Sequence, residues 1–118
     1  MVSVGVGVHR ALEVAERLAA EHGAEAGVID LRSVQPLDRK AVCDAVETSG
    51  RLLVVDEDYR DFGLSGELAA TVLEAGIHAR FARVCVEGTI PFDQRRERLA
   101  LPNAERITEA AVNLLQAR

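Results

Sequence analysis

The chain has 118 residues, of which 48% are hydrophobic, and its net charge is −5. This length and composition suit one folded domain and argue against intrinsic disorder. The acidic balance argues against a nucleic-acid partner, which needs a basic face, and no apolar run approaches the roughly 20 residues of a membrane span, so no membrane partner is expected.

The first elements are predicted from a change of hydrophobic period. β-branched residues alternate over residues 2–8, which predicts a strand that ends in a Gly-x-Gly turn. Apolar residues then recur at helical spacing, which predicts a helix over residues 9–22 with Gly23 as its stop. The short apolar run at 26–31 predicts a second strand.

The middle of the chain repeats this alternation. Asp38 is predicted to cap a second helix that ends at Gly50. The fully apolar run 52–55 is typical of a central parallel strand covered on both faces. Residues 56–63 are polar and end in glycine, so they are predicted to form a loop.

The last elements follow the same logic. Ser65 is predicted to cap a third helix that ends at Gly76, and residues 80–86 form a fourth predicted strand. A short helix is expected over 93–99, and Asn103 is predicted to cap the last helix.

Strands separated by helices predict an α/β fold. Right-handed crossovers give three layers (α/β/α) around a mainly parallel sheet of four to five strands, in the order 2-1-3-4. Residues 1–118 then form a single domain. A first strand that begins at residue 2 is what a domain cut from a longer chain shows, and whole α/β domains also begin this way.

The turn after the first strand is a candidate anion site formed by Gly5, Gly7 and His9, because free N–H groups point out of a helix N-terminus. A dinucleotide fingerprint would sit here too, with Asp30 as its acidic partner. Arg10 stands where the third glycine of that fingerprint belongs, which argues against dinucleotide binding.

No residue is assigned a catalytic, cofactor-binding or metal-binding role. Asp56 lies where a phospho-accepting aspartate could sit, but the carboxylates and lysine that such chemistry needs are not nearby. The three histidines are scattered. Cys43 and Cys85 lack metal-ligand spacing and are predicted to be small core residues, which favours a reducing, cytoplasmic setting.

Five residues are candidates for contact with a protein partner. Arg95 and Arg96 belong to a basic cluster in the predicted short helix. Tyr59, Phe62 and Phe92 are aromatic residues in predicted loops, where they suit partner contacts better than core positions.

With these elements placed, nearly the whole chain resembles the C-terminal transketolase-like domain of the β subunit of 2-oxo acid dehydrogenase E1 components, of the pyruvate, branched-chain and acetoin type. The order and spacing of six segments carry the resemblance. They are Val8-His9-Arg10-Ala11-Leu12-Glu13, Val28-Ile29-Asp30-Leu31-Arg32-Ser33-Val34-Gln35-Pro36-Leu37-Asp38, Gly50-Arg51-Leu52-Leu53-Val54-Val55-Asp56-Glu57, Gly63-Leu64-Ser65-Gly66-Glu67, Ile90-Pro91-Phe92 and Leu101-Pro102. The segments 58–62 and 76–79 depart from the family pattern.

The resemblance implies a non-catalytic assembly domain, and two other functions stay as alternatives. In the family, thiamine diphosphate and Mg²⁺ are bound by two other domains, so this chain alone is expected to be inactive and to bind no cofactor. The implied partners are an E1 α subunit, a second β subunit and the subunit-binding domain of E2. The alternatives are a free-standing nucleotide- or anion-binding domain and an unrelated interaction module. The sequence does not select the 2-oxo acid.

Overall fold

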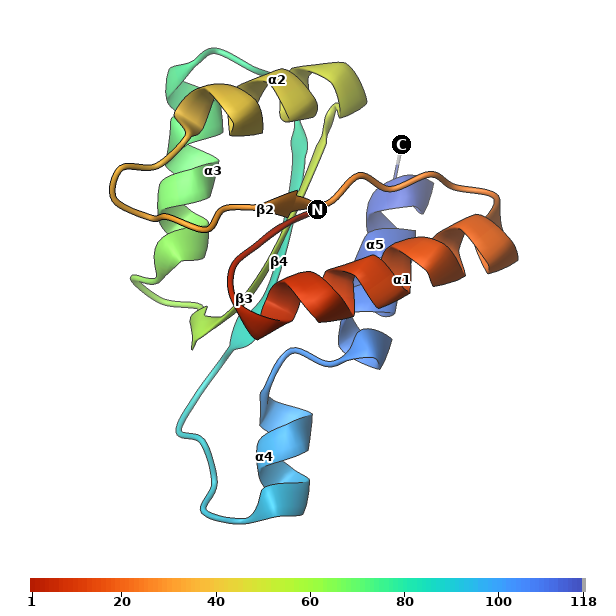
Figure 1. Ribbon diagram of the computed structural model, residues 1–118, viewed down its shortest axis with the longest axis vertical. Helices are drawn as coiled ribbons and strands as arrows, with labels where there is room; N and C mark the ends of the chain where they lie inside the picture. The colour runs from red at the N-terminus through yellow and green to blue at the C-terminus, as the bar shows by residue number, and fades with distance from the viewer. Residues whose placement is uncertain (118) are drawn as a thin grey trace.

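Strands and helices alternate along residues 1–117, the part of the chain that the computed structural model describes (Figure 1). The strands are β1 (Val2–Ser3), β2 (Ile29–Asp30), β3 (Arg51–Tyr59) and β4 (Arg80–Val86). The helices are α1 (Val6–His22), α2 (Arg39–Ser49), α3 (Leu64–Glu74), α4 (Gln94–Ala100) and α5 (Ala104–Gln116). No described helix has the length and apolar character needed to cross a membrane.

The four strands form one parallel sheet in the order β2-β1-β3-β4, which confirms the predicted fold class and strand order. Val2 of β1 lies in register with Ile29 on one side and Val54 on the other. β1 and β3 are therefore the two central strands. β2 is added on one side of this pair and β4 on the other, so the strand order changes direction between β1 and β3.

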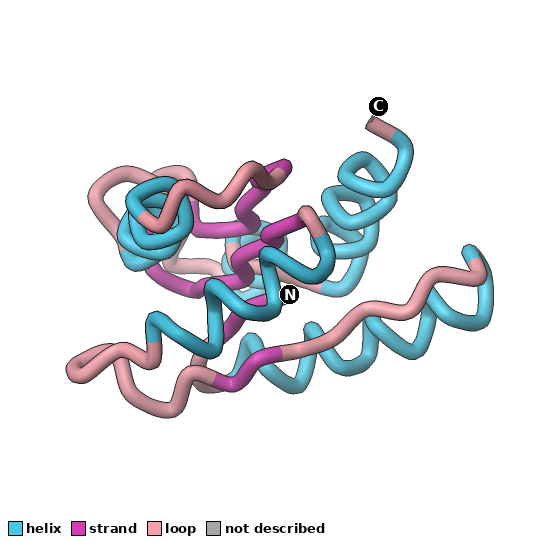
Figure 2. The backbone as a smooth tube through the Cα atoms, turned by 90° about the horizontal axis from the view of Figure 1, so that it is seen from above, coloured by secondary structure: helices cyan, strands magenta, loops and turns pink. Residues whose placement is uncertain are grey.

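Two apolar clusters sandwich the sheet, because successive side chains of β3 point to opposite faces. Leu52 and Val54 pack with α2 and α3, whereas Leu53 and Val55 pack with α1 and α5. Figure 2 shows the helices on both sides of the strands. This is the predicted three-layer arrangement.

Most helix ends follow the local signals of the sequence. The side chains of Asp38 and Asn103 accept hydrogen bonds of 3.0 Å from the backbone N–H groups of Ala41 and Arg106, so both predicted caps are confirmed. Gly23 and Gly50 follow α1 and α2 in the left-handed conformation, which favours glycine. The predicted ends of the first two helices are therefore correct.

The first two strands are shorter than predicted. β1 stops at Ser3, and α1 begins at Val6 instead of residue 9, because Gly5 turns the chain at once with φ of 61°. β2 covers only Ile29–Asp30 of the predicted run 26–31. The reason is its neighbour: β2 pairs with β1 alone, and β1 offers two residues to pair with.

Two predictions between β3 and α3 are wrong. β3 continues to Tyr59, so residues 56–59, Tyr59 included, lie in a strand and not in a loop. β4 sustains the pairing, with Tyr59 opposite Val86 after an irregularity. Ser65 is not a cap. Gly63 precedes α3, and Ser65 is fully buried inside the helix.

Smaller differences occur elsewhere. The short helix α4 is shifted by one residue from the predicted 93–99, because Asp93 caps it from outside and accepts from the N–H of Arg96 at 2.9 Å. α3 ends at Glu74, and Gly76 follows two residues later, after Ala75, with φ of 73°. Cys85 is buried as predicted, whereas Cys43 is half-buried.

Candidate partner-binding surface

The segment 87–101, here called the arm, projects from the carboxyl end of the sheet and carries α4 (Figure 1). No residue of α4 is buried. The side chain of Phe92 is fully exposed, at 110% of its reference area, and Leu99 is 66% exposed. Exposed apolar side chains on a segment whose helix buries nothing are candidates for contact with a protein partner.

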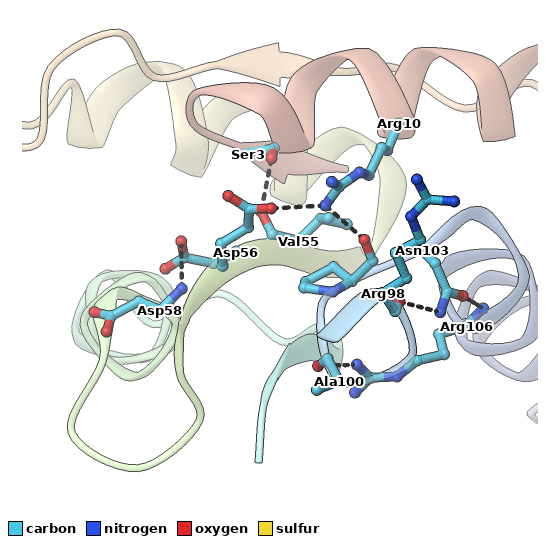
Figure 3. A network of polar contacts seen from close by, with 11 residues as sticks. Ser3, Arg10, Val55, Asp56, Asp58, Arg98, Ala100, Asn103 and Arg106 are labelled. Carbon is cyan, nitrogen blue, oxygen red and sulfur yellow. Dashed lines mark hydrogen bonds and ion pairs between the residues drawn. The ribbon is translucent and has the colours of Figure 1, made fainter. Parts of the chain in front are cut away.

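Arg106 of α5 ties the two ends of the arm together. Figure 3 shows its contact with Ala100 at one of these ends. Its Nη2 donates to the backbone carbonyl oxygen of Cys85, and its Nη1 donates to that of Ala100, both at 2.9 Å. Glu87 lies 3.8 Å from the same guanidinium. The arm is thus a long loop with a helix in it, and the side chain of Arg106 links the residues at its two ends.

A second arginine fixes the end of the arm to the sheet. Nη1 of Arg10, on α1, donates to the carbonyl oxygen of Pro102 at 2.7 Å and pairs with Glu57 Oε1 at 2.8 Å. Pro102 is fully buried, so the chain returns from the arm into the core at this residue. Nδ2 of Asn103 also donates to the carbonyl oxygen of Arg98 at 3.4 Å.

Sequence reasoning missed Arg10 and Arg106 as organisers of the surface. Arg10 was considered only because it replaces a glycine, and Arg106 was not singled out. No local pattern could have identified them, since Arg10 is 92 residues from Pro102 and Arg106 is 21 residues from Cys85.

The last two residues of β3 and the turn that leads to α3, here together called the acidic loop (58–63), lie beside the base of the arm. The backbone N–H of Arg60 donates to the carbonyl of Val86 at 2.8 Å, and Nη1 of Arg60 lies 3.3 Å from Glu87. Phe62 is fully exposed (108%) with φ of 62°, and Tyr59 is half-exposed.

The five candidate partner residues therefore share one end of the molecule. Tyr59 and Phe62 belong to the acidic loop or its edge, and Phe92, Arg95 and Arg96 belong to the arm. All five are exposed, and both segments leave the sheet at the carboxyl ends of neighbouring strands. That any partner binds there stays a prediction.

The candidate anion site is a tight packing turn. Gly7 is buried so closely that a Cβ atom would lie 2.3 Å from Ser3 Oγ and 3.3 Å from the carbonyl oxygen of Val55. Ser3 Oγ itself donates to that carbonyl at 2.6 Å. Gly5 supplies the turn, and His9 is exposed on α1. The glycines are explained by the fit of α1 against β1 and β3.

Asp30, the acidic residue of the dinucleotide hypothesis, is engaged locally. Its carboxylate accepts from the backbone N–H of Arg32 at 3.2 Å and pairs with Arg32 Nε at 3.3 Å. One cavity of about 280 Å³ lies at the amino ends of the strands, among α1, α2 and α5, and another of about 400 Å³ lies between α2 and α3. Neither is lined by Gly5, Gly7, His9 or Asp30.

Asp56 is the buried carboxylate at the carboxyl end of the sheet, with 6% of its surface exposed. Burial raises the pKa of its carboxyl group, and a hydrogen bond from the backbone N–H of Asp58 at 3.2 Å opposes the increase. Burial likewise raises the pKa of the Cys85 thiol. Nearby, Arg83 Nη1 donates to Ser65 Oγ at 3.3 Å. Within residues 1–117, no three metal-ligating side chains converge.

Comparison with known proteins assigns this architecture to a family. The family model described as "Transketolase, C-terminal domain" matches residues 1–107. The β subunit of acetoin:2,6-dichlorophenolindophenol oxidoreductase from Cupriavidus necator is 40% identical over 115 residues, which cover 94% of this chain and 34% of that protein. The pyruvate dehydrogenase E1 component subunit beta of Staphylococcus epidermidis is 39% identical over 120 residues, which cover 98% of this chain and 36% of that protein.

A solved structure has the same fold. It is described as a split gene transketolase in an inactive beta4 tetramer, and it matches with a TM-score of 0.87 at 24% identity, over 97% of this chain and 38% of the other. This chain thus spans about a third of the length of the curated relatives it matches.

Proposed function

This chain belongs to the transketolase C-terminal domain family, and on that premise we propose that it is the non-catalytic assembly domain of a 2-oxo acid dehydrogenase E1 β subunit. Its relatives named as β subunits of pyruvate and acetoin oxidoreductases support this assignment. In the complete enzyme, such a subunit contributes to the oxidative decarboxylation of a 2-oxo acid.

The observation that carries the proposal is the exposed arm. A domain that spans a third of its relatives has to meet the remaining parts of the enzyme through surfaces of its own, and α4 contributes no buried residue to this domain. Phe92 and Leu99 are the apolar anchors that such a contact would bury. We infer that the arm is the part of the domain that packs against other subunits.

Thiamine diphosphate with Mg²⁺ is the cofactor that the family implies, and the residues of this domain do not fit it. A diphosphate-bound Mg²⁺ needs free oxygen ligands that converge on one point. At the carboxyl end of the sheet, Asp56 is buried and Glu57 is paired with Arg10. Within residues 1–117, no three side chains of the metal-ligating types lie close enough together to bind one ion. The cofactor is therefore assigned to other parts of the enzyme.

The proposed partners are an E1 α subunit, a second β subunit and the subunit-binding domain of E2. With a net charge of −5, the chain would attract a basic E2 module over a distance.

The direct test is co-purification of this chain with the E1 α and E2 chains encoded in the same genome. We expect a complex that Phe92→Ala/Leu99→Ala weakens, because both side chains lie on the arm. Leu73→Ala is the control, since Leu73 is 73% exposed, close to the 66% of Leu99, and lies on α3, away from the arm. No retention of either chain would count against the assembly role.

Calorimetric titration with thiamine diphosphate and Mg²⁺ tests the non-catalytic part of the proposal. We expect no heat of binding to the isolated chain, and saturable binding would overturn it. A thermal shift on addition of NAD or ATP would instead favour the free-standing nucleotide-binding alternative, which uses Gly5, Gly7 and Asp30.

A further inference from the structure

We propose that the cavity of about 280 Å³ at the amino ends of the strands binds a medium-chain fatty acid, whose carboxylate is held by Arg51. The apolar chain of this ligand lies among α1, α2 and α5, whose residues line the cavity. The arm leaves the sheet at the opposite, carboxyl end. The inference therefore goes beyond the assembly role and does not depend on it.

The cavity lies where the two apolar clusters of the domain meet. Leu52 belongs to the cluster under α2 and α3, Leu53 belongs to the cluster under α1 and α5, and both line the cavity. Protein interiors are otherwise packed with few voids larger than a water molecule. An apolar cavity of about 150 Å³ holds benzene, so one of about 280 Å³ holds an apolar group of roughly ten carbon atoms.

The walls of the cavity are apolar, and its mouth is open to solvent. Val2, Leu18 and Ala111 are buried lining residues from three different elements. Ser49, at the end of α2, and Leu115, on α5, are lining residues that are exposed. A ligand with an apolar chain and one polar end fits this arrangement, because the chain is buried and the polar end stays near water.

Arg51, the first residue of β3, places its guanidinium in the wall of the cavity. Its Nε donates to the carbonyl oxygen of Leu114 at 3.2 Å, and its Nη1 donates to that of Ser49 at 3.3 Å. Both acceptors belong to lining residues, so the guanidinium spans the space between α5 and the end of α2. Within residues 1–117, Arg51 forms no ion pair and its Nη2 donates no hydrogen bond. A carboxylate is the natural acceptor for this group.

A second arginine adds positive charge on the same face of the sheet. Arg80 of β4 lies in register with Arg51, and in-register residues of neighbouring parallel strands point to the same face. Its Nη1 is buried and has no hydrogen-bond partner in the described part of the chain. Arg80 does not line the cavity, but its charge adds to the positive potential that attracts an anion to Arg51.

The charge balance favours a single carboxylate as the polar end of the ligand. Glu25 is also a lining residue and repels anions, so the site tolerates one negative charge better than the two of a phosphate. A neutral apolar molecule would leave Nη2 of Arg51 without an acceptor. These two conditions are met by a fatty acid.

Calorimetric titration of the 118-residue chain with octanoate tests the proposal. We expect saturable binding with a dissociation constant on the order of 0.1 mM, and a melting temperature that rises with octanoate concentration. Octylamine and 1-octanol have the same chain with a positive or a neutral end. Octylamine should bind at least about tenfold more weakly than octanoate, because its ammonium faces Arg51.

Two charge variants test the assignment of the carboxylate. Arg51→Gln should weaken octanoate binding at least about tenfold and leave 1-octanol binding unchanged, since only the charge-assisted hydrogen bond is lost. Arg17→Gln is the matched control, because it makes the same charge change on α1 at a residue that does not line the cavity. Glu25→Gln should tighten octanoate binding by about two- to fivefold.

A cavity-filling variant tests the location of the chain. Ala45→Leu adds three carbon atoms at an exposed lining position of α2, and it should weaken both octanoate and 1-octanol. Ala20→Leu, at an exposed position of α1 that is not a lining residue, should weaken neither.

Three results would overturn the inference. They are the lack of saturable octanoate binding to the wild-type chain, equal binding of octanoate and octylamine, and octanoate binding that neither Arg51→Gln nor Ala45→Leu weakens. If Arg51→Gln does not fold, the comparison of octanoate with octylamine on the wild type decides the role of the charge. Retained co-purification with E1 α and E2 without octanoate binding would reject this inference and leave the proposed function standing.

Discussion

The guanidinium of Arg106 donates a hydrogen bond of 2.9 Å to the backbone carbonyl of Cys85, at the point where β4 leads into the arm. The same guanidinium donates to Ala100 at the other end. Because the side chain is part-buried and satisfies two carbonyls, it determines where the arm leaves the body and where it returns. The base of the arm is therefore fixed to α5.

Replacing Arg106 by leucine should loosen the arm. Two backbone carbonyls would lose their partner, and we expect a loss of about 1–3 kcal/mol in the free energy of unfolding. Amide hydrogen exchange over residues 87–101 should accelerate more than exchange in β3. Arg17→Leu is the control, since the Arg17 side chain is 32% exposed, close to the 28% of Arg106, and within residues 1–117 bonds only to Glu13. Equal exchange in both variants would contradict the role given to Arg106.

Two glycine-to-alanine changes should have opposite effects. Gly7→Ala places a methyl group 2.3 Å from Ser3 Oγ, so we expect a destabilisation of about 1–3 kcal/mol in urea unfolding. Gly66→Ala lies in α3 with nothing within 4 Å of the new methyl group, so it should stabilise by about 0.5–1 kcal/mol. If Gly7→Ala is neutral, α1 does not pack on β1 as closely as described.

The buried carboxyl of Asp56 should make stability depend on pH. Burial raises its pKa above the usual 3.8, so the folded state binds the proton more tightly than the unfolded chain does. Its contribution is therefore fully present below about pH 3.8 and is lost as pH rises through the folded-state pKa. We expect Asp56→Asn to gain stability relative to the wild type over that rise, measured by urea unfolding at several pH values. A difference that is constant with pH would reject this account.

Asn103 and Asp93 cap the last two helices, and their removal should have different effects on the free energy of unfolding. Asn103 caps α5, which packs into the core, so Asn103→Ala should lower the free energy of unfolding by about 1 kcal/mol. Asp93 caps α4, which buries nothing, so Asp93→Ala should leave global unfolding nearly unchanged and increase hydrogen exchange only in α4. A global effect from Asp93→Ala would mean that α4 is coupled to the core.

The sequence by itself determined the alternation of elements, the strand order and most helix ends. These depend on signals that act over a few residues. Asp38 and Asn103 cap the helices that follow them, Gly23 and Gly50 adopt the left-handed conformation that only glycine accepts cheaply, and the apolar run at 52–55 marks the central strand. The exposure of the five candidate partner residues also agrees with their predicted place outside the core.

Only the tertiary structure decided which residues organise the surface. Gly7 is required by the approach of Ser3 and Val55, and Ser65 is held in the core by Arg83 rather than at a helix end. Arg10 and Arg106 bind carbonyls that lie 92 and 21 residues away in the chain. No local pattern encodes such partners, because they meet only after the sheet and its helices have packed.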